Sequence, residues 1–237
     1  MRPVALSPRL QALARQVPCG VRFADIGTDH ARLPVWLLEH DVIPWAIATD
    51  LREGPLEQAR QLVLRHNLAE RVSLRLGDGL APIRPEEVDW CAISGMGGET
   101  ISAILSAAPW VLEKGIRFLL QPMTSVQDLR GWLWRNGFCI EQEALIQEGD
   151  TLYVSLTVLP GPMPPLSPVE EWAGRQYRGM EAPLRKRYLE RLSDRVEGAL
   201  AGLRCSTRAE DRCRVSEWED LSKGLDQMRK EWEAWQQ

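Results

Sequence analysis

The feature that most constrains the fold is an alternation of short apolar runs with segments of helical periodicity between residues 5 and 159. Such alternation predicts a mostly parallel sheet, because each helix carries the chain back across the sheet before the next strand begins. Ser7 and Pro8 have the residue types of a helix N-cap and a first helical position. The predicted strands are 21–27, 45–50, 72–76, 90–94 and 117–121, and the predicted helices are 7–16, 31–39, 56–66, 101–112 and 126–135.

A hairpin is predicted to close this sheet. Residues 138–147 and 151–159 have the composition of two strands joined by the turn Glu148-Gly149-Asp150. A hairpin makes one late strand antiparallel, which is typical of class I methyltransferase folds, whereas dinucleotide dehydrogenase folds normally end on parallel strands. The predicted fold class is therefore α/β, a Rossmann-like class I methyltransferase fold with a closing antiparallel β-hairpin.

The chain then changes character. The prolines between Pro160 and Pro165 cannot continue a strand or a helix, so a linker is expected there. Beyond it, two stretches carry apolar residues at steps of three and four, which predicts a C-terminal α-helical, coiled-coil-like antiparallel hairpin. We expect a methyltransferase domain over 1–160 and a helical domain over 168–237. The two apolar seams are Leu189, Leu192, Val196, Ala199 and Leu203, and Trp218, Leu221, Leu225, Met228, Trp232 and Trp235.

The composition narrows the cellular compartments and the binding partners that can be expected for this protein. The net charge is −4, so any surface that binds nucleic acid must be local. The five cysteines form no C-x-x-C pair, which argues against a disulfide framework or a zinc site and suits a reducing cytoplasm. Arg9 and Arg15 interrupt the N-terminal apolar residues, and no segment has the length of a membrane span. We therefore expect a cytoplasmic protein without metal or membrane contact, and a monomer.

Acidic residues follow several of the predicted strands. Asp29 takes the place of the second glycine in a Gly-x-Gly turn, where a carboxylate would repel a pyrophosphate but would attract a ligand with sulfonium and ammonium groups. Asp50, at the end of the second strand, suits two ribose hydroxyls, and Asp78 between glycines suits an adenine amino group. Each alone has an ordinary structural explanation, such as a helix cap or a turn. Together they predict one cationic nucleoside at the strand ends.

The same residues carry a family resemblance. FADIGTDHARLP, AIATDLREGPLEQA, RLGDGL, AISGMGGETISAIL and LLQPMTSVQDLRGWLWRNGF resemble the bacterial tRNA (adenine(22)-N1)-methyltransferase family in the same order over roughly residues 5–159. Two positions depart from the family pattern, which often has asparagine at Met123 and an aromatic residue at Arg32. The resemblance implies S-adenosylmethionine as cofactor, and it implies cofactor contacts at Gly27, Asp29, His30, Asp50, Gly77, Asp78, Gly79 and Met96.

The resemblance also implies the reaction, which is methyl transfer to N1 of an adenine that tRNA presents unpaired or flipped. Methylation makes the base cationic, so an acceptor should take a hydrogen bond and then a proton from its 6-amino group. Asp29 is the first candidate for this catalytic role, and the backbone from Gly95 to Gly97 and the side chain of Gln121 are weaker ones. Arg9 is expected at the mouth of the site, in contact with substrate.

Basic residues are concentrated between residues 175 and 195. Arg187, Arg191 and Arg195 recur every fourth residue and should share one helix face. Most charged helix faces are only solvated, but with the family resemblance we predict that this row contacts the tRNA backbone.

Three other functions remain open at this point. The first is a methyltransferase that acts on another RNA, a protein or a small metabolite, since its cofactor residues would be the same. The second is a non-catalytic RNA-binding protein that retains a methyltransferase-like domain, although Asp50 and Asp78 argue against it. The third, a nicotinamide dehydrogenase, fits least because of Asp29 and the closing hairpin.

Overall fold

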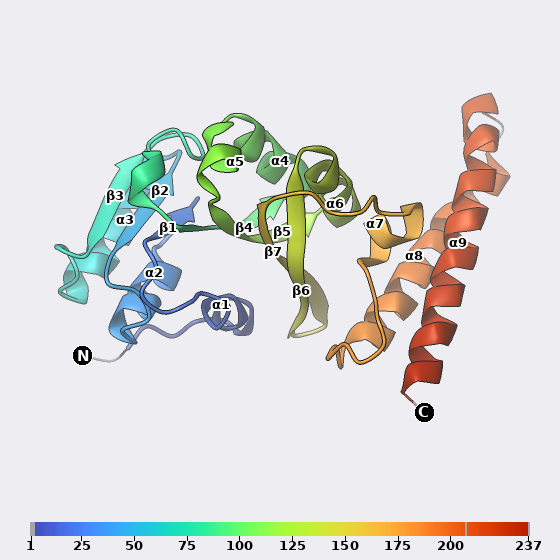
Figure 1. Cartoon of the computed structure of the whole chain (residues 1–237), viewed down its shortest axis with the longest axis horizontal. Coiled ribbons are helices and arrows are strands. Elements are labelled where there is room, and N and C mark those ends of the chain that lie inside the picture. The colour runs from blue at the N-terminus through green and yellow to red at the C-terminus, as the bar shows by residue number, and fades with distance from the viewer. Residues whose placement is uncertain (1–2, 207, 237) are drawn as a thin grey trace. The chain divides into compact units, whose positions relative to one another are not determined.

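The computed structural model describes residues 3–206 and 208–236, and the chain divides between Pro164 and Pro165 into two units. A seven-stranded sheet in the order β3-β2-β1-β4-β5-β7-β6 forms the centre of the first unit (Figure 1). β7 runs antiparallel to both of its neighbours and the other pairs are parallel, so the predicted closing hairpin is confirmed. The strands are β1 (Phe23–Ile26), β2 (Ala46–Asp50), β3 (Val72–Leu76), β4 (Trp90–Gly97), β5 (Arg117–Thr124), β6 (Phe138–Glu148) and β7 (Thr151–Pro160).

Helices cover both faces of this sheet, as strand–helix alternation requires. α1 (Pro8–Ala14), α2 (Arg32–Glu39) and α3 (Glu53–Arg65) pack on one face (Figure 1). The opposite face carries α4 (Gly98–Ser106), α5 (Trp110–Lys114) and α6 (Val126–Arg135), and a short 3₁₀ turn, η1 (Pro85–Glu87), precedes β4. Every residue of β1 and β2 is buried, because these central strands have a helical layer on each side.

Local sequence explains the first helix and the hairpin. The Ser7 side chain accepts a hydrogen bond from the Leu10 N–H at 3.4 Å. Pro8 occupies the first helical position, where a backbone N–H has no partner within the helix, so the lack of an N–H in proline costs no hydrogen bond. Gly149 in the β6–β7 turn has φ +56°, a conformation that glycine adopts without steric cost.

Several predicted boundaries in the first unit were wrong. β5 continues to Thr124 and does not end at residue 121, and α3 begins at Glu53, before residue 56. β4 does not end at Ser94 but continues to Gly97, which pairs with Thr124 across a bulge at Gly95, whose φ is +77°. The predicted helix 101–112 is two helices, α4 and α5. It breaks before Pro109, because proline has no N–H to donate and clashes with the preceding turn.

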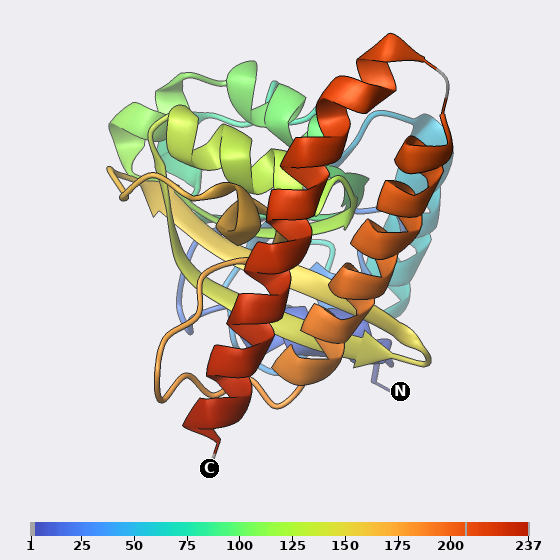
Figure 2. The ribbon, with the colours of Figure 1, turned by 90° about the vertical axis from the view of Figure 1, so that its right-hand side faces the viewer.

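The second unit is helical. α8 (Arg185–Cys205) and α9 (Ala209–Trp235) run antiparallel (Figure 2), and buried residues of the two predicted apolar seams face one another. A third helix, α7 (Pro168–Ala173), was not predicted. Ser167 and Glu170 form a capping box at its start, and this Ser-x-x-Glu spacing was the available sequence signal.

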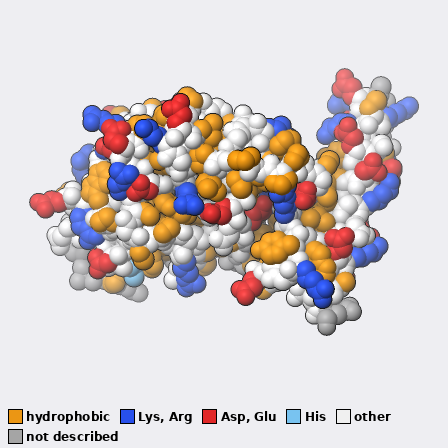
Figure 3. Space-filling model, in the orientation of Figure 1, with side chains coloured by type: hydrophobic (Ala, Val, Ile, Leu, Met, Phe, Trp, Pro, Cys, Tyr) orange, Lys and Arg blue, Asp and Glu red, His pale blue; other side chains and the backbone are white. Residues whose placement is uncertain are grey.

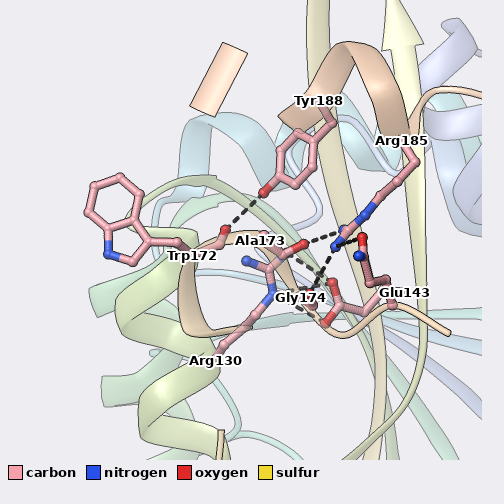
Figure 4. Close-up of polar contacts among 8 residues, drawn as sticks. Arg130, Glu143, Trp172, Ala173, Gly174, Arg185 and Tyr188 are labelled. Atoms are coloured by element: carbon pink, nitrogen blue, oxygen red, sulfur yellow. Dashed lines mark hydrogen bonds and ion pairs between the residues drawn. The ribbon is translucent and has the colours of Figure 1, made fainter. Parts of the chain in front are cut away.

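Two buried arginines stabilise these units from within (Figure 4). In the first unit, the fully buried Arg130 of α6 pairs with Glu143 of β6, with 2.9 Å between Nη2 and Oε2. In the second, the Arg185 guanidinium donates to the carbonyl oxygens of Ala173 and Gly174 and so satisfies the C-terminal end of α7. Neither arginine is among the lining residues of the two cavities described below.

Candidate active site

The strand register brings the carboxyl ends of the central strands to one edge of the sheet. Ile26, the last residue of β1, lies opposite Thr49 of β2 and Ile93 of β4. Just beyond it, the Thr28 N–H donates to the Thr49 carbonyl oxygen at 2.8 Å. The sheet order reverses between β1 and β4, and in open α/β sheets this switch point is where ligands bind.

A cavity of about 680 Å³ opens at this edge. It is lined by every residue predicted to bind the cofactor, and Arg9 of α1 lines it as well. The eight predicted residues are Gly27, Asp29, His30, Asp50, Gly77, Asp78, Gly79 and Met96.

The β1–α2 loop in the cavity wall has an unusual backbone. Gly27, Asp29 and Ala31 have φ values of +68°, +55° and +53°. The left-handed region is costly for residues with a Cβ, and such strain is concentrated at functional sites. The φ of Gly27 favours glycine, and a Cβ there would also lie 2.1 Å from the Met96 Cε atom, so the flexible Met96 side chain would have to move.

The acidic residues are held in different ways. The Asp50 side chain is buried, its Oδ2 accepts from the Asp29 N–H at 3.3 Å, and its Oδ1 accepts from the Arg52 N–H at 3.0 Å. The Asp29 side chain is 65% exposed, with its Oδ2 3.4 Å from Nε2 of His30. Asp50 is therefore a fixed acceptor on the cavity wall, whereas Asp29 is free to turn towards a ligand.

Asp25 is a cavity residue that the sequence interpretation did not assign. It is only 4% exposed, and its Oδ2 accepts a hydrogen bond from the Thr28 hydroxyl at 2.6 Å. Burial raises the pKa of Asp25 to about 6, against the opposing effect of the Thr28 hydrogen bond and with a further rise from the charges of Asp50 and Asp29. The available signal was a carboxylate in the otherwise apolar run of β1.

Two of the predicted substrate residues, Arg9 and Gln121, are hydrogen-bonded to each other. The Arg9 Nη1 donates to the Oε1 atom of Gln121 at 2.5 Å, and the Gly95 N–H donates to the same oxygen at 3.2 Å. Gln121 is fully buried, and neither it nor Gly97 is among the residues that line the cavity. Gln121 thus orients Arg9 and the end of β4, and the predicted substrate roles of Gln121 and Gly97 stay predictions.

The three remaining predicted residues, Arg187, Arg191 and Arg195, are on α8 of the second unit. The first two are half-buried and Arg195 is exposed, with its guanidinium 5.3 Å from the centre of the Trp172 ring. Figure 3 shows lysine and arginine side chains interspersed with acidic ones along the helices of this unit.

Within residues 3–206 and 208–236, no helix combines the length and apolar character needed to cross a bilayer. No group of three or more His, Cys, Asp or Glu side chains in the same ranges has the arrangement of a metal site.

Comparison with known proteins agrees with this geometry. Residues 6–156 match a protein family described as a methyltransferase domain. The tRNA (adenine(22)-N(1))-methyltransferase of Bacillus subtilis is 35% identical over 161 residues, which are 68% of this chain and 68% of that protein.

Solved structures extend the likeness to nearly the whole chain. The crystal structure of the B. subtilis tRNA methyltransferase TrmK has a TM-score of 0.85 at 26% identity, covering 95% of this chain and 99% of that one. A Streptococcus pneumoniae protein solved in complex with S-adenosyl-L-methionine has a TM-score of 0.82 at 30% identity, covering 95% and 100%. The cavity, the sheet order and these matches show that the chain belongs to the bacterial tRNA (adenine(22)-N1)-methyltransferase family of S-adenosylmethionine-dependent enzymes.

Proposed function

We propose that this protein transfers the methyl group of S-adenosylmethionine to N1 of an adenine in tRNA, and that the adenine is at position 22. The observation that carries the proposal is the convergence of Asp25, Asp29, Asp50 and Asp78 on one cavity at the switch point of the sheet. The name of the B. subtilis relative supports the target position. We further propose that residues 1–160 form the methyltransferase domain and that residues 168–237 form a helical domain that contacts tRNA.

The cavity suits this cofactor chemically. Its volume is within the range of about 300–1,000 Å³ that is usual for small-molecule sites. A sulfonium and an α-ammonium group are both cationic, and carboxylates stabilise such charges where a pyrophosphate would be repelled. Asp50 is the expected acceptor for the ribose hydroxyls, because the Asp29 and Arg52 N–H groups fix its orientation. Asp78, which is exposed, is the expected acceptor for the adenine amino group.

The bound cofactor would supply an electrophilic methyl group, and the protein would align adenine N1 with it. N1 attacks with a neutral lone pair and needs no prior deprotonation, so alignment is the main contribution, and well-oriented reactions gain on the order of 7–11 kcal/mol. We propose that Asp29 accepts a hydrogen bond, and then a proton, from the 6-amino group as the ring becomes cationic. Its exposed carboxylate, next to His30, leaves it free to do so.

Arg9 completes the mouth of the site. Its side chain is 20% exposed, donates to Gln121 and lies with its Nε 3.9 Å from Oε2 of Glu148. The Oε1 atom of Glu148 also accepts from the Arg9 backbone N–H at 3.4 Å. We propose that Arg9 contacts the RNA beside the target adenine. We also propose a cytoplasmic location, since tRNA is the substrate and all five cysteines are free.

The decisive test incubates the purified protein with S-adenosylmethionine labelled in its methyl group and with unmodified tRNA transcripts. Label should enter tRNA, and primer extension should stop at adenine 22, because an N1-methyl group blocks base pairing. A transcript with guanine at that position serves as the control and should stay unlabelled. Label at another nucleotide would overturn the target assignment, and cofactor binding without transfer to any RNA would overturn the proposed reaction.

A further inference from the structure

A second cavity of about 450 Å³ shares a wall with the cofactor cavity. His30 and Arg32 line both cavities. The rest of the second cavity comes from the N-terminal segment at Val4 and from α3, which contributes Gln58, Gln61 and Arg65, and His66 follows at its end. Two histidines, two arginines and two glutamines thus line it, and among the described residues no aspartate or glutamate does.

The two cavities differ in their charged side chains. The cofactor cavity is lined by four carboxylates and three arginines, one of them the shared Arg32, whereas the described residues that line the second cavity include Arg32 and Arg65 and no carboxylate. Some exposed arginines of this unit are paired with carboxylates, as Arg60 is with Glu57 at 3.2 Å. Within the described ranges Arg32 and Arg65 form no ion pair, and the one hydrogen bond of these two side chains runs from Arg65 Nε to the Gln61 carbonyl oxygen. Their charge remains available to an anion.

The inner wall of the second cavity is fixed. The His66 Nδ1 lies 2.6 Å from Oε1 of Glu39, and since a carboxylate can only accept, Nδ1 is the donor. The other Glu39 oxygen accepts from the Val4 N–H at 2.9 Å. Burial opposes ionisation of Glu39, but these two hydrogen bonds outweigh it and hold the pKa of Glu39 below its usual value. Both Glu39 oxygens therefore accept hydrogen bonds from residues that line the cavity, and the His66 side chain, 9% exposed, is held in place.

We propose that the second cavity binds a phosphate group of the tRNA strand next to the target adenine. Guanidinium groups bind phosphate through charge-assisted hydrogen bonds, and glutamine amides add neutral donors. The shared wall of His30 and Arg32 would place this phosphate beside the nucleotide whose base enters the cofactor cavity. The proposal rests on tRNA being the substrate and adds a contact that orients the strand.

Phosphate-ethylation interference on a tRNA transcript tests this directly. Each ethyl group removes one backbone charge, so ethylation of the proposed phosphate should reduce binding to the wild-type protein. Arg65→Gln should abolish the interference at that phosphate alone, raise the tRNA Kd about tenfold and reduce the salt slope by about one unit. Arg65 is exposed and lines only the second cavity, so the Kd for S-adenosylmethionine should not change.

Arg60→Gln is the matched control, since it removes the same charge from α3 outside both cavities and should keep the wild-type interference pattern. Arg65→Lys keeps the charge and should restore most of the affinity. The proposal is overturned if Arg65→Gln keeps the wild-type interference pattern and tRNA Kd. It is also overturned if inorganic phosphate binds in an Arg65-dependent manner while the tRNA constants are unaffected. A wild-type protein that methylates no tRNA would instead refute the proposed function.

Discussion

In the protein without cofactor, the ionised form of Asp25 is disfavoured, because its side chain is buried and has the carboxylates of Asp29 and Asp50 as neighbours. We expect Asp25→Asn to stabilise the protein without cofactor at pH 8 by up to about 3 kcal/mol. The asparagine Oδ1 can still accept the Thr28 hydrogen bond. The same change should weaken S-adenosylmethionine binding, because it removes a carboxylate that faces a cation. Urea unfolding and titration calorimetry measure the two effects.

The pH dependence of this difference follows from the direction of the shift. Folding raises the pKa of Asp25 from the ordinary 3.8 to about 6, so between these values the folded chain keeps a proton that the unfolded chain has released. The stability that Asp25 contributes is therefore fully present below its unfolded pKa of 3.8 and is lost as the pH rises through its folded pKa of about 6. Wild type and Asp25→Asn should differ little at pH 4 and most above pH 6. Equal cofactor affinity of the two proteins at pH 8 would show that Asp25 does not face the cation.

Asp29 allows a different test, because its side chain is exposed and its proposed role lies in the reaction step. Asp29→Asn should lower kcat by about 10²-fold or more, the usual contribution of a positioned proton acceptor. The KM for tRNA should change little. Single-turnover methylation with saturating S-adenosylmethionine isolates this step from cofactor binding. Near-normal turnover together with normal cofactor affinity would remove Asp29 from catalysis.

At this scale the sequence predicted acidic residues that line the cavity, but not the hydrogen bonds that connect the site. Asp29, Asp50 and Asp78 were recognisable because each follows a predicted strand, and parallel strands end at one edge. The hydrogen bond from Arg9 to Gln121 joins residues 112 positions apart, and no local pattern indicates such a pairing. Asp25 was overlooked because it lies inside a strand, where a polar side chain usually has a structural explanation.

At the scale of elements, the glycines of the second unit offer a matched pair of tests. A Cβ on Gly202 of α8 would meet no atom within 4 Å, whereas one on Gly224 of α9 would lie 3.1 Å from Cβ of Val169 in α7. Gly202→Ala should therefore stabilise the protein by about 0.5–1 kcal/mol through helix propensity. Gly224→Ala gains the same propensity but must displace α7, so we expect a net loss of about 1 kcal/mol. Urea unfolding followed at 222 nm compares them, and equal effects would show that α7 does not pack closely at Gly224.

Element boundaries were predictable where the sequence contains residues typical of helix caps or turns. Ser7-Pro8 marked the start of α1, and the glycine turn marked the β6–β7 hairpin. The end of β4 was missed because a glycine-rich stretch resembles a loop, while pairing with Thr124 of β5 keeps it in the sheet. Pairing between strands depends on the whole sheet, and a window along one strand does not contain that information.

At the scale of the whole molecule, a protein of net charge −4 must bind a polyanion through local groups of positive charge. The carboxylates around the cofactor cavity account for part of the negative charge, and they serve a cation there. Among the described residues, Arg32 and Arg65 beside that cavity form one local positive group, and the arginine row on α8 is another. Binding of tRNA should accordingly be steeply salt-dependent, while S-adenosylmethionine binding should be much less so.

A specific contact between tRNA and the arginine row on α8 can be distinguished from a general effect of net charge on tRNA binding. The triple variant Arg187→Gln, Arg191→Gln and Arg195→Gln should raise the tRNA Kd by more than tenfold and lower the salt slope by about two to three units. Lys223, Arg229 and Lys230 of α9 supply the control, because replacing them with glutamine also removes three charges, but each is already paired with Asp220 or Asp226. Paired charges attract phosphate weakly, so the control should change the Kd far less. Equal effects of the two triple variants in filter binding at several salt concentrations would mean that net charge alone matters and that α8 has no specific contact with tRNA. An unchanged Kd in both would assign the helical unit a structural role.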